Sequence, residues 1–248
     1  MFQPRVALAS LSGRSDADWA RAAAPFVGAA FLGGIAVDQA TREAARDLVA
    51  RDRNEFLPPD PLAFVDDQLG DLADTSLKAG INVRSATVEP VRAVAEICRE
   101  HDAVLEINAH CRQAELIAAG SGHALLRDAE RLREYVSAAA DTGATVSVKV
   151  RTEVEGVDLP ATARRIDAAG ADVIHVDAMD SEPVVRDVVE ATDAFVIANN
   201  EVRDRESVNE YLSYGADAVS VGRPSDDPRV LRRVRRATRA WFEDEPLP

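Results

Sequence analysis

Short apolar or β-branched runs recur along the chain, and each is followed by a segment with helical periodicity. Eight runs have this character: Val6–Ser10, Val27–Ala36, Ile81–Ser85, Ala103–Asn108, Thr145–Arg151, Asp172–Asp177, Phe195–Asn199 and Ala218–Gly222. Several are apolar at nearly every position, which is typical of strands covered on both faces. The helical segments between them have capping residues at their expected starts, at Ser15, Asp128, Asp158 and Asp204. The pattern predicts buried strands that alternate with helices.

Glycines punctuate this alternation at recurring places. Gly80, Gly143, Gly170 and Gly215 each lie shortly before a run, where helix-to-strand turns favour a positive φ. Eight strand–helix units in 248 residues predict a (β/α)8 barrel formed by residues 1–248 as a single α/β domain. A doubly wound open sheet is the alternative, but G-x-G-x-x-G is absent after the first run. Residues 41–79 carry two helical patterns, which predicts an extra helical insertion at the barrel rim.

Composition indicates the class of protein and the environment in which it folds. The chain is 46% hydrophobic, which excludes intrinsic disorder. Its 43 acidic residues against 29 basic ones give a net charge of −14, and only Lys78 and Lys149 are lysines. This balance is typical of a halophilic surface in a salt-rich cytoplasm. Cys98 and Cys111 cannot form a disulfide framework, so a reducing, cytoplasmic location is expected. We expect neither a secretory signal nor a membrane span.

Polar residues gather where the predicted strands end, at the end of a barrel where reaction sites lie. They are Ser10, Ser12, Arg84, Glu106, Asn108, His110, Cys111, Lys149, Arg151, His175, Asp177, Asn199, Asn200, Gly222 and Arg223. Burying such groups costs on the order of several kcal/mol unless a partner compensates. We therefore expect a polar ligand in the barrel mouth.

Lys149 is the most informative of these residues. In TVSVKVR it alternates with valines, in a chain that uses arginine almost everywhere else. The position favours a donor to an electron-rich ligand or a Schiff-base amine, although a lysine that reaches solvent from a strand end is the alternative. His175 at the end of its strand is either a hydrogen-bonded core histidine or a ligand contact. No His or Cys spacing suits a metal, and we predict none.

Three further segments favour ligand chemistry. Asn199 and Asn200, and Gly222 with Arg223, lie in the loops after the last two runs, where barrels commonly bind phosphate; ordinary turns are the alternative. Cys111 follows a strand end between His110 and Arg112, and these neighbours favour a thiol that exchanges protons. Cys98 is interpreted as a small core residue.

Taken in order, these segments resemble the dihydrouridine synthases, flavin-dependent TIM-barrel enzymes that reduce uracil bases in tRNA. The span EINAHCRQAELIAAGSGHALLRDAERL is similar to that family's strand-4 motif, in which an Asn precedes the catalytic Cys. VSVKVR resembles the strand that carries a flavin-contacting Lys, and His175 matches a His beside FMN. ANNE and VGR resemble the two FMN-phosphate loops. The resemblance covers most of the chain from Ile81 to Arg223 and is greatest to a compact archaeal branch.

The resemblance implies an FMN-dependent oxidoreductase that acts in tRNA processing, with NAD(P)H as electron donor. It implies that Cys111 is the catalytic general acid. The residues that it assigns to the cofactor are Asn108, Lys149, His175, Asn199, Asn200, Glu201, Gly222 and Arg223.

Several positions depart from the family pattern. His110 and Arg112 replace the Gly and Pro that flank the cysteine, Arg84 replaces a Gln, and Asn200 replaces a Gly. The C-terminal helical domain that grips tRNA is expected to be missing. Arg84 and Arg112 are candidates for binding an anionic substrate, and a free nucleotide or an orotate-like acid would fit as well as tRNA.

Other functions therefore stay open. The chain is a tRNA-modifying enzyme, a dihydroorotate-dehydrogenase-like flavoenzyme for a small pyrimidine-like substrate, or a flavin-free Schiff-base lyase or aldolase that uses Lys149. A non-catalytic binding barrel is a further alternative. The sequence makes no prediction of oligomeric state.

Overall fold

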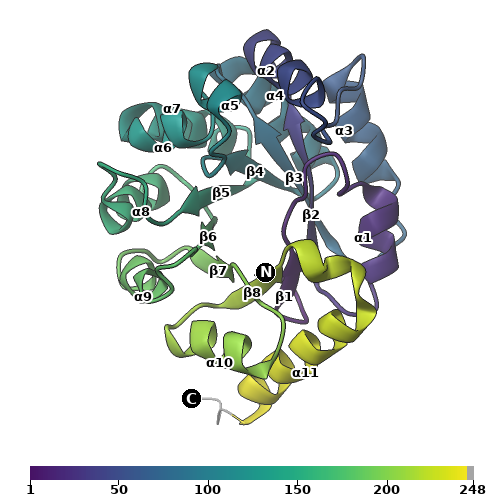
Figure 1. Cartoon of the computed structure of the whole chain (residues 1–248), viewed down its shortest axis with the longest axis vertical. Coiled ribbons are helices and arrows are strands. Elements are labelled where there is room, and N and C mark those ends of the chain that lie inside the picture. Colours follow the sequence, from purple (N-terminus) through teal and green to yellow (C-terminus); the bar gives the residue numbers. More distant parts are fainter. Residues whose placement is uncertain (245–248) are drawn as a thin grey trace.

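Eight parallel strands form a closed barrel in this computed structural model, which describes residues 1–244. The strands are β1 (Val6–Leu8), β2 (Ala29–Ala36), β3 (Lys78–Arg84), β4 (Val104–Asn108), β5 (Thr145–Arg151), β6 (Val173–Asp177), β7 (Phe195–Asn199) and β8 (Ala218–Val221). Each strand pairs with its sequence neighbours, and β1 closes the ring against β8 (Figure 1). The predicted (β/α)8 barrel is confirmed.

Helices surround this ring on the outside (Figure 1). They are α1 (Ala17–Ala23), α2 (Gln39–Val49), α3 (Pro61–Gly70), α4 (Val88–Glu100), α5 (Ala114–Ala118), α6 (His123–Arg127), α7 (Ala129–Ala140), α8 (Leu159–Asp167), α9 (Val184–Val189), α10 (Arg205–Ser213) and α11 (Pro228–Asp244), with a short 3-10 turn η1 (Arg223–Asp226) after β8. No helix among the described residues is both long enough and apolar enough to cross a bilayer.

Three of the four predicted helix starts are confirmed by their capping geometry. The side chains of Asp128, Asp158 and Asp204 each accept a hydrogen bond from the backbone N–H three residues later, which stabilises the first helical turn. The prediction for Ser15 is wrong, because Asp16 caps α1 instead. The hydroxyl of Ser15 donates instead to backbone carbonyls in the loop before α1 and in β2.

Three of the four predicted turn glycines are also confirmed. Gly143, Gly170 and Gly215 have φ values of +81°, +103° and +92°. Gly80 is not in a turn but inside β3, and its backbone needs no positive φ. A Cβ there would lie 2.6 Å from the ring of Phe31, so this glycine is required for close packing inside the barrel.

The insertion predicted at residues 41–79 contains most of α2 and all of α3. Helix α2 contacts α5, which follows β4, and α3 packs beside α4. The loop between α2 and α3 carries Glu55 into the barrel mouth, where its side chain is 1% exposed. The segment between β2 and β3 therefore supplies a residue to the site.

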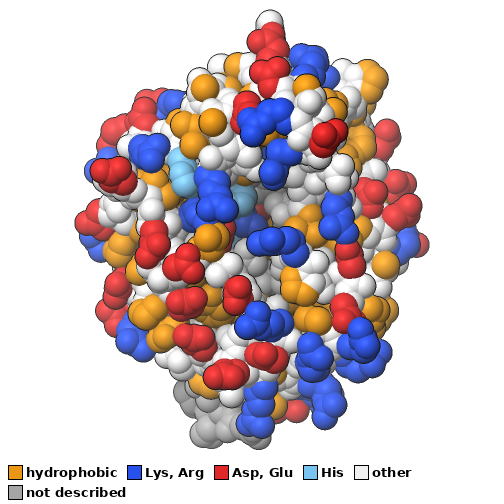
Figure 2. Space-filling model, viewed as in Figure 1, with side chains coloured by type: hydrophobic (Ala, Val, Ile, Leu, Met, Phe, Trp, Pro, Cys, Tyr) orange, Lys and Arg blue, Asp and Glu red, His pale blue; other side chains and the backbone are white. Residues whose placement is uncertain are grey.

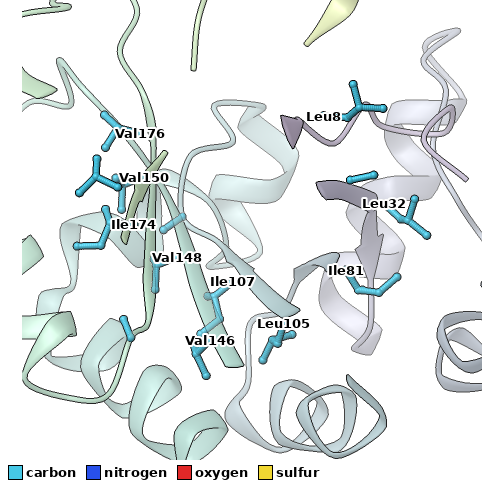
Figure 3. Packing of buried hydrophobic residues seen from close by; sticks show 14 of the residues in the cluster. Leu8, Leu32, Ile81, Leu105, Ile107, Val146, Val148, Val150, Ile174 and Val176 are labelled. Atoms are coloured by element: carbon cyan, nitrogen blue, oxygen red, sulfur yellow. The ribbon is translucent and has the colours of Figure 1, made fainter. Parts of the chain in front are cut away.

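Strand side chains alternate between two environments. One set, including Leu105, Val146 and Ile174, packs against the helices and forms the main core (Figure 3). The other set points into the barrel. Its layer near the strand N-termini is apolar and consists of Ala7, Ala29, Phe31, Val104, Val173, Ile197 and Ala218. Toward the C-terminal ends the inward positions become polar and charged, so the strands are apolar on both faces over only part of their length.

Candidate functional site

A chain of hydrogen bonds crosses the barrel interior above its apolar layer. Five buried side chains form it: Asn108, Asn82, Glu106, His175 and Ser220. Asn108 Nδ2 donates to Asn82 Oδ1 at 2.8 Å, and Asn82 Nδ2 donates to Glu106 Oε1 at 2.7 Å. His175 Nδ1 lies 2.7 Å from Glu106 Oε2, and His175 Nε2 lies 2.7 Å from Ser220 Oγ. We call these five residues the interior ladder.

The electrostatics of the ladder assign its protons. Burial and the nearby Lys149 lower the pKa of His175, outweighing the opposite effect of Glu106. Burial raises the pKa of Glu106, but His175, Lys149 and Asn82 outweigh it and bring that pKa below its usual value. The pair is therefore an ionised carboxylate and a neutral imidazole at pH 7. His175 Nδ1–H donates to Glu106, and the hydroxyl of Ser220 donates to His175 Nε2.

The upper end of the ladder fixes the cysteine loop. Asn108 Oδ1 accepts from the backbone N–H of Cys111 at 3.1 Å and from that of His110 at 3.3 Å. The carbonyl of Cys111 accepts from the N–H of His123 at 2.9 Å. Gly122 has a φ of +59°, and a Cβ there would lie 2.3 Å from the Cys111 carbonyl oxygen. The glycine after the cysteine is therefore required by this close approach.

A buried arginine lies beside the cysteine. The Arg84 guanidinium is 1% exposed and donates to Glu55 and to the hydroxyl of Ser12. Burial lowers the pKa of Arg84, but Cys111 and Glu55 outweigh it and raise that pKa, so the guanidinium stays charged. Gly34, at a bulge in β2, leaves room for it, since a Cβ there would lie 2.9 Å from Arg84 Nη2.

A large cavity of about 670 Å³ opens over the C-terminal ends of the strands. Its volume lies within the range of about 300–1,000 Å³ that is typical of cofactor and ligand sites. Lys149 lines it at 2% exposure, with no hydrogen-bond or ion-pair partner for Nζ among the described residues. Figure 2 shows Lys, Arg and His side chains around a hollow in the middle of this view.

The two loops predicted to bind phosphate meet at this cavity. Asn199, Asn200, Glu201, Gly222 and Arg223 all line it. The backbone at Asn200 and Glu201 has φ values of +126° and +49°, a strained geometry of the kind that persists at ligand sites. Arg223 is exposed and has no ion-pair partner within residues 1–244. The loops therefore offer a free guanidinium and a shaped backbone to an anion.

A second, smaller cavity of about 140 Å³ adjoins the first and contains the cysteine. It is lined by Ser10, Ser12, Arg84, Asn108, His110, Cys111, Arg112, Gln113 and Arg151. Four of these residues also line the large cavity: Ser10, His110, Arg112 and Arg151. The two cavities thus share a wall, and a ligand at their junction reaches both Lys149 and Cys111.

The structure brings together most of the predicted site residues, but the polar groups of three of them bind other protein groups instead of facing the large cavity. Asn108 and His175, predicted to contact a cofactor, do not line the large cavity, because their polar atoms are engaged in the ladder. Arg84 was predicted to bind substrate, but both of its terminal nitrogens donate within the protein, to Glu55 and to Ser12. Among residues 1–244, no group of three or more His, Cys, Asp or Glu side chains is arranged to hold a metal ion.

Sequence reasoning missed several contributors. Asn82 and Ser220 complete the ladder, Glu55 pairs with Arg84, and Gln113 lines the small cavity. Asn82 and Ser220 lie at inward positions of β3 and β8, so strand alternation could have found them. Glu55 lies in the insertion and left no comparable signal.

The fold and site define a (β/α)8 barrel with two joined, cation-lined cavities at its C-terminal end, one of them holding a cysteine. A family model described as dihydrouridine synthase (Dus) matches residues 73–247, more than half of the chain. The chain belongs to the dihydrouridine synthase family. This membership, with the barrel, supports an FMN-dependent oxidoreductase.

Other relatives are similar over most of the chain. The uncharacterized protein MJ0144 of Methanocaldococcus jannaschii is 26% identical over 232 residues, which cover 88% of both chains. A morphinone reductase structure in complex with tetrahydroNAD superposes with a TM-score of 0.64 at 13% identity, covering 94% of this chain and 87% of that one. FabK from Thermotoga maritima gives a TM-score of 0.59 at 15% identity, covering 89% of this chain and 58% of that one. At these identities the two structures show the shared fold alone.

The ladder predicts how stability depends on pH. The pKa of His175 is lowered on folding, so below about pH 6.5 the unfolded chain binds a proton that the folded protein does not. The free energy of unfolding should therefore fall as pH drops from 7.5 to 5.5, by at most about 1.4 kcal/mol per pH unit for this group. Urea unfolding monitored by Trp fluorescence measures the slope. His175→Gln should flatten it; a slope equal to that of the wild type would contradict this proton assignment.

Proposed function

We propose that the protein is an FMN-dependent oxidoreductase that adds hydrogen across the C=C bond of a pyrimidine-like ring, or removes it in reverse. The observation that carries the proposal is Lys149, which is 2% exposed, lines a cofactor-sized cavity and has no hydrogen-bond or ion-pair partner for Nζ among the described residues. A buried cation without a partner is unfavourable, so a ligand with an electron-rich edge is the expected occupant.

The lining of the large cavity fits FMN. Arg223, with the Asn199–Glu201 loop and Gly222, would hold the phosphate, and Lys149 would contact the ring system. Bound FMN supplies a hydride, and NAD(P)H is the proposed source of its two electrons. Lys149 stabilises negative charge that develops on the ring when it is reduced.

Cys111 is the proposed general acid. The thiol lines the small cavity, and its loop is fixed by Asn108. As one carbon of the substrate C=C accepts the hydride, its neighbour takes the proton from Sγ, which leaves a thiolate. The charged Arg84 beside it stabilises this thiolate until it regains a proton from solvent. The ring gains two electrons and two hydrogens in all, as in conversion of a uracil ring to its dihydro form.

The same buried amine also favours a second candidate. A lysine that lines a ligand-sized cavity can act as the nucleophile for a Schiff base, and a flavin-free lyase or aldolase would use Lys149 in this way. Borohydride trapping of a carbonyl substrate on Lys149, in a protein that binds no flavin, would establish that function. A tRNA uridine and a small pyrimidine, as in a dihydroorotate-dehydrogenase-like reaction, both present the bond required by the first proposal.

Flavin titration tests the phosphate site. We expect the apoprotein to bind FMN more tightly than riboflavin, which lacks the phosphate. Arg223→Gln should weaken FMN binding by about tenfold or more and leave riboflavin binding unchanged, because it removes a charge-assisted hydrogen bond to phosphate. Quenching of flavin fluorescence measures both affinities. Absence of flavin binding, or equal affinities for the two flavins, would contradict the assignment.

The two cysteines provide a matched pair for testing the acid. Cys111→Ala should retain FMN affinity but slow reduction of the C=C bond by about 10²–10⁴-fold. Cys98→Ala should leave the rate unchanged, since Cys98 lies in the core, where burial raises its pKa to about 12. Single-turnover oxidation of the reduced, FMN-loaded protein by uridine-containing substrate measures the rate. Equal rates in the two variants would exclude Cys111 as the proton donor.

A further inference from the structure

The small cavity beside Cys111 is surrounded by polar atoms that lack partners. Arg84 Nε, His110 Nδ1 and Gln113 Oε1 are buried without a hydrogen bond to any described residue. All three side chains line this cavity, and Arg84 as a whole is only 1% exposed. Buried polar groups are almost always hydrogen-bonded in folded proteins, so three orphans at one cavity indicate a polar ligand group there.

The charges around the cavity specify the sign and size of the ligand's charge. Arg151 pairs with Asp177 at 3.0 Å, and Arg84 pairs with Glu55, so two guanidinium groups are already neutralised. Arg112 lines the cavity and has no ion pair within the described chain. Burial, with Lys149 and Arg84 nearby, holds the pKa of His110 well below its usual range, so its imidazole is neutral. The cavity therefore carries one net positive charge, which matches a monoanion.

The donors are suited to a carboxylate. Arg84 Nε–H and the Arg112 guanidinium are donors only, and the hydroxyl of Ser12, which accepts from Arg84, has its own proton free to donate. The amide of Gln113 can present either its oxygen or its nitrogen. Arginine pairs with planar carboxylates through parallel N–H groups, and a carboxylate brings the single negative charge that the cavity lacks.

The volume of about 140 Å³ is sufficient for a small polar group. A carboxylate on a ring fits this space. The ring itself would lie at the junction of the two cavities, next to Cys111 and to the flavin site.

We infer that the small cavity is a carboxylate subsite, and that the substrate is a small heterocyclic acid with a carboxylate on the ring that is reduced. This inference rests on the proposed function, which places the flavin in the adjoining cavity. Arg112 is the main recognition residue, assisted by Arg84 Nε, while Glu55 and Ser12 hold the Arg84 guanidinium in position.

A pair of probes that differ only in the carboxylate tests the inference. Uracil and uracil-6-carboxylate are titrated by calorimetry into the FMN-loaded protein at one fixed salt concentration. We expect the carboxylate to bind at least tenfold more tightly than uracil. Arg112→Gln should reduce this ratio to about one, since it removes the only unpaired guanidinium of the small cavity. Arg127→Gln, an exposed arginine on α6, makes the same charge change outside the site and should keep the wild-type ratio.

The outcomes separate this inference from the proposed function. FMN binding is measured in the same samples, and its absence would overturn the proposed function. Protein that binds FMN but binds the two probes equally would overturn the carboxylate subsite alone. Retention of the preference in Arg112→Gln would also overturn it. Reduction of uridine in tRNA by the FMN-loaded protein, with no preference between the free probes, would assign the site to the nucleic acid instead.

Discussion

Hydrogen bonds across the barrel interior connect its strands to the loop that carries Cys111. Ser220, His175, Glu106, Asn82 and Asn108 satisfy one another in sequence, and the last of them holds the backbone of the cysteine loop. A partly satisfied network at this depth would be strongly destabilising, whereas a complete one specifies a single arrangement. The position of Cys111 is therefore set by strands on opposite sides of the barrel as well as by its own loop.

The ladder separates the barrel interior into layers that differ in polarity. The lower interior is apolar and packs like an ordinary core, and the ladder above it is polar but internally satisfied. In the upper layer, Lys149 Nζ and Arg84 Nε have no partner among the described residues, although both residues are at most 2% exposed. In a chain of net charge −14, a cluster of cations at one mouth concentrates the attraction for anions at that place.

Much of this arrangement follows from local sequence. Strand periodicity gave the barrel, and position at the strand ends placed Lys149, Cys111 and Arg223 in one mouth. The two loops predicted to bind phosphate could also be located from the sequence, because Gly222 and the residues after β7 follow consecutive strands. What these residues share is that their location depends on their own strand alone.

The remainder depends on contacts between distant segments. The sequence pattern left His175 open between a hydrogen-bonded core histidine and a ligand contact, because its partners, Glu106 and Ser220, lie 69 and 45 positions away. Arg84 was predicted to bind substrate, but Glu55, 29 positions earlier in the chain, accepts from its Nη1, and only Nε has no partner among the described residues. Gly80 was predicted to be a turn glycine. The residue that requires it, Phe31, lies on the neighbouring strand and leaves no signal in the sequence around Gly80. No local pattern encodes such pairings.

The central claim is that one mouth holds the flavin and the cysteine together, and a crystal structure of the protein with FMN tests it most directly. The account predicts the phosphate against Arg223 and the Asn199–Glu201 loop, with the ring against Lys149 and beside the Cys111 sulfur. Density for the flavin outside the large cavity, or a ring separated from Cys111 by protein, would contradict it.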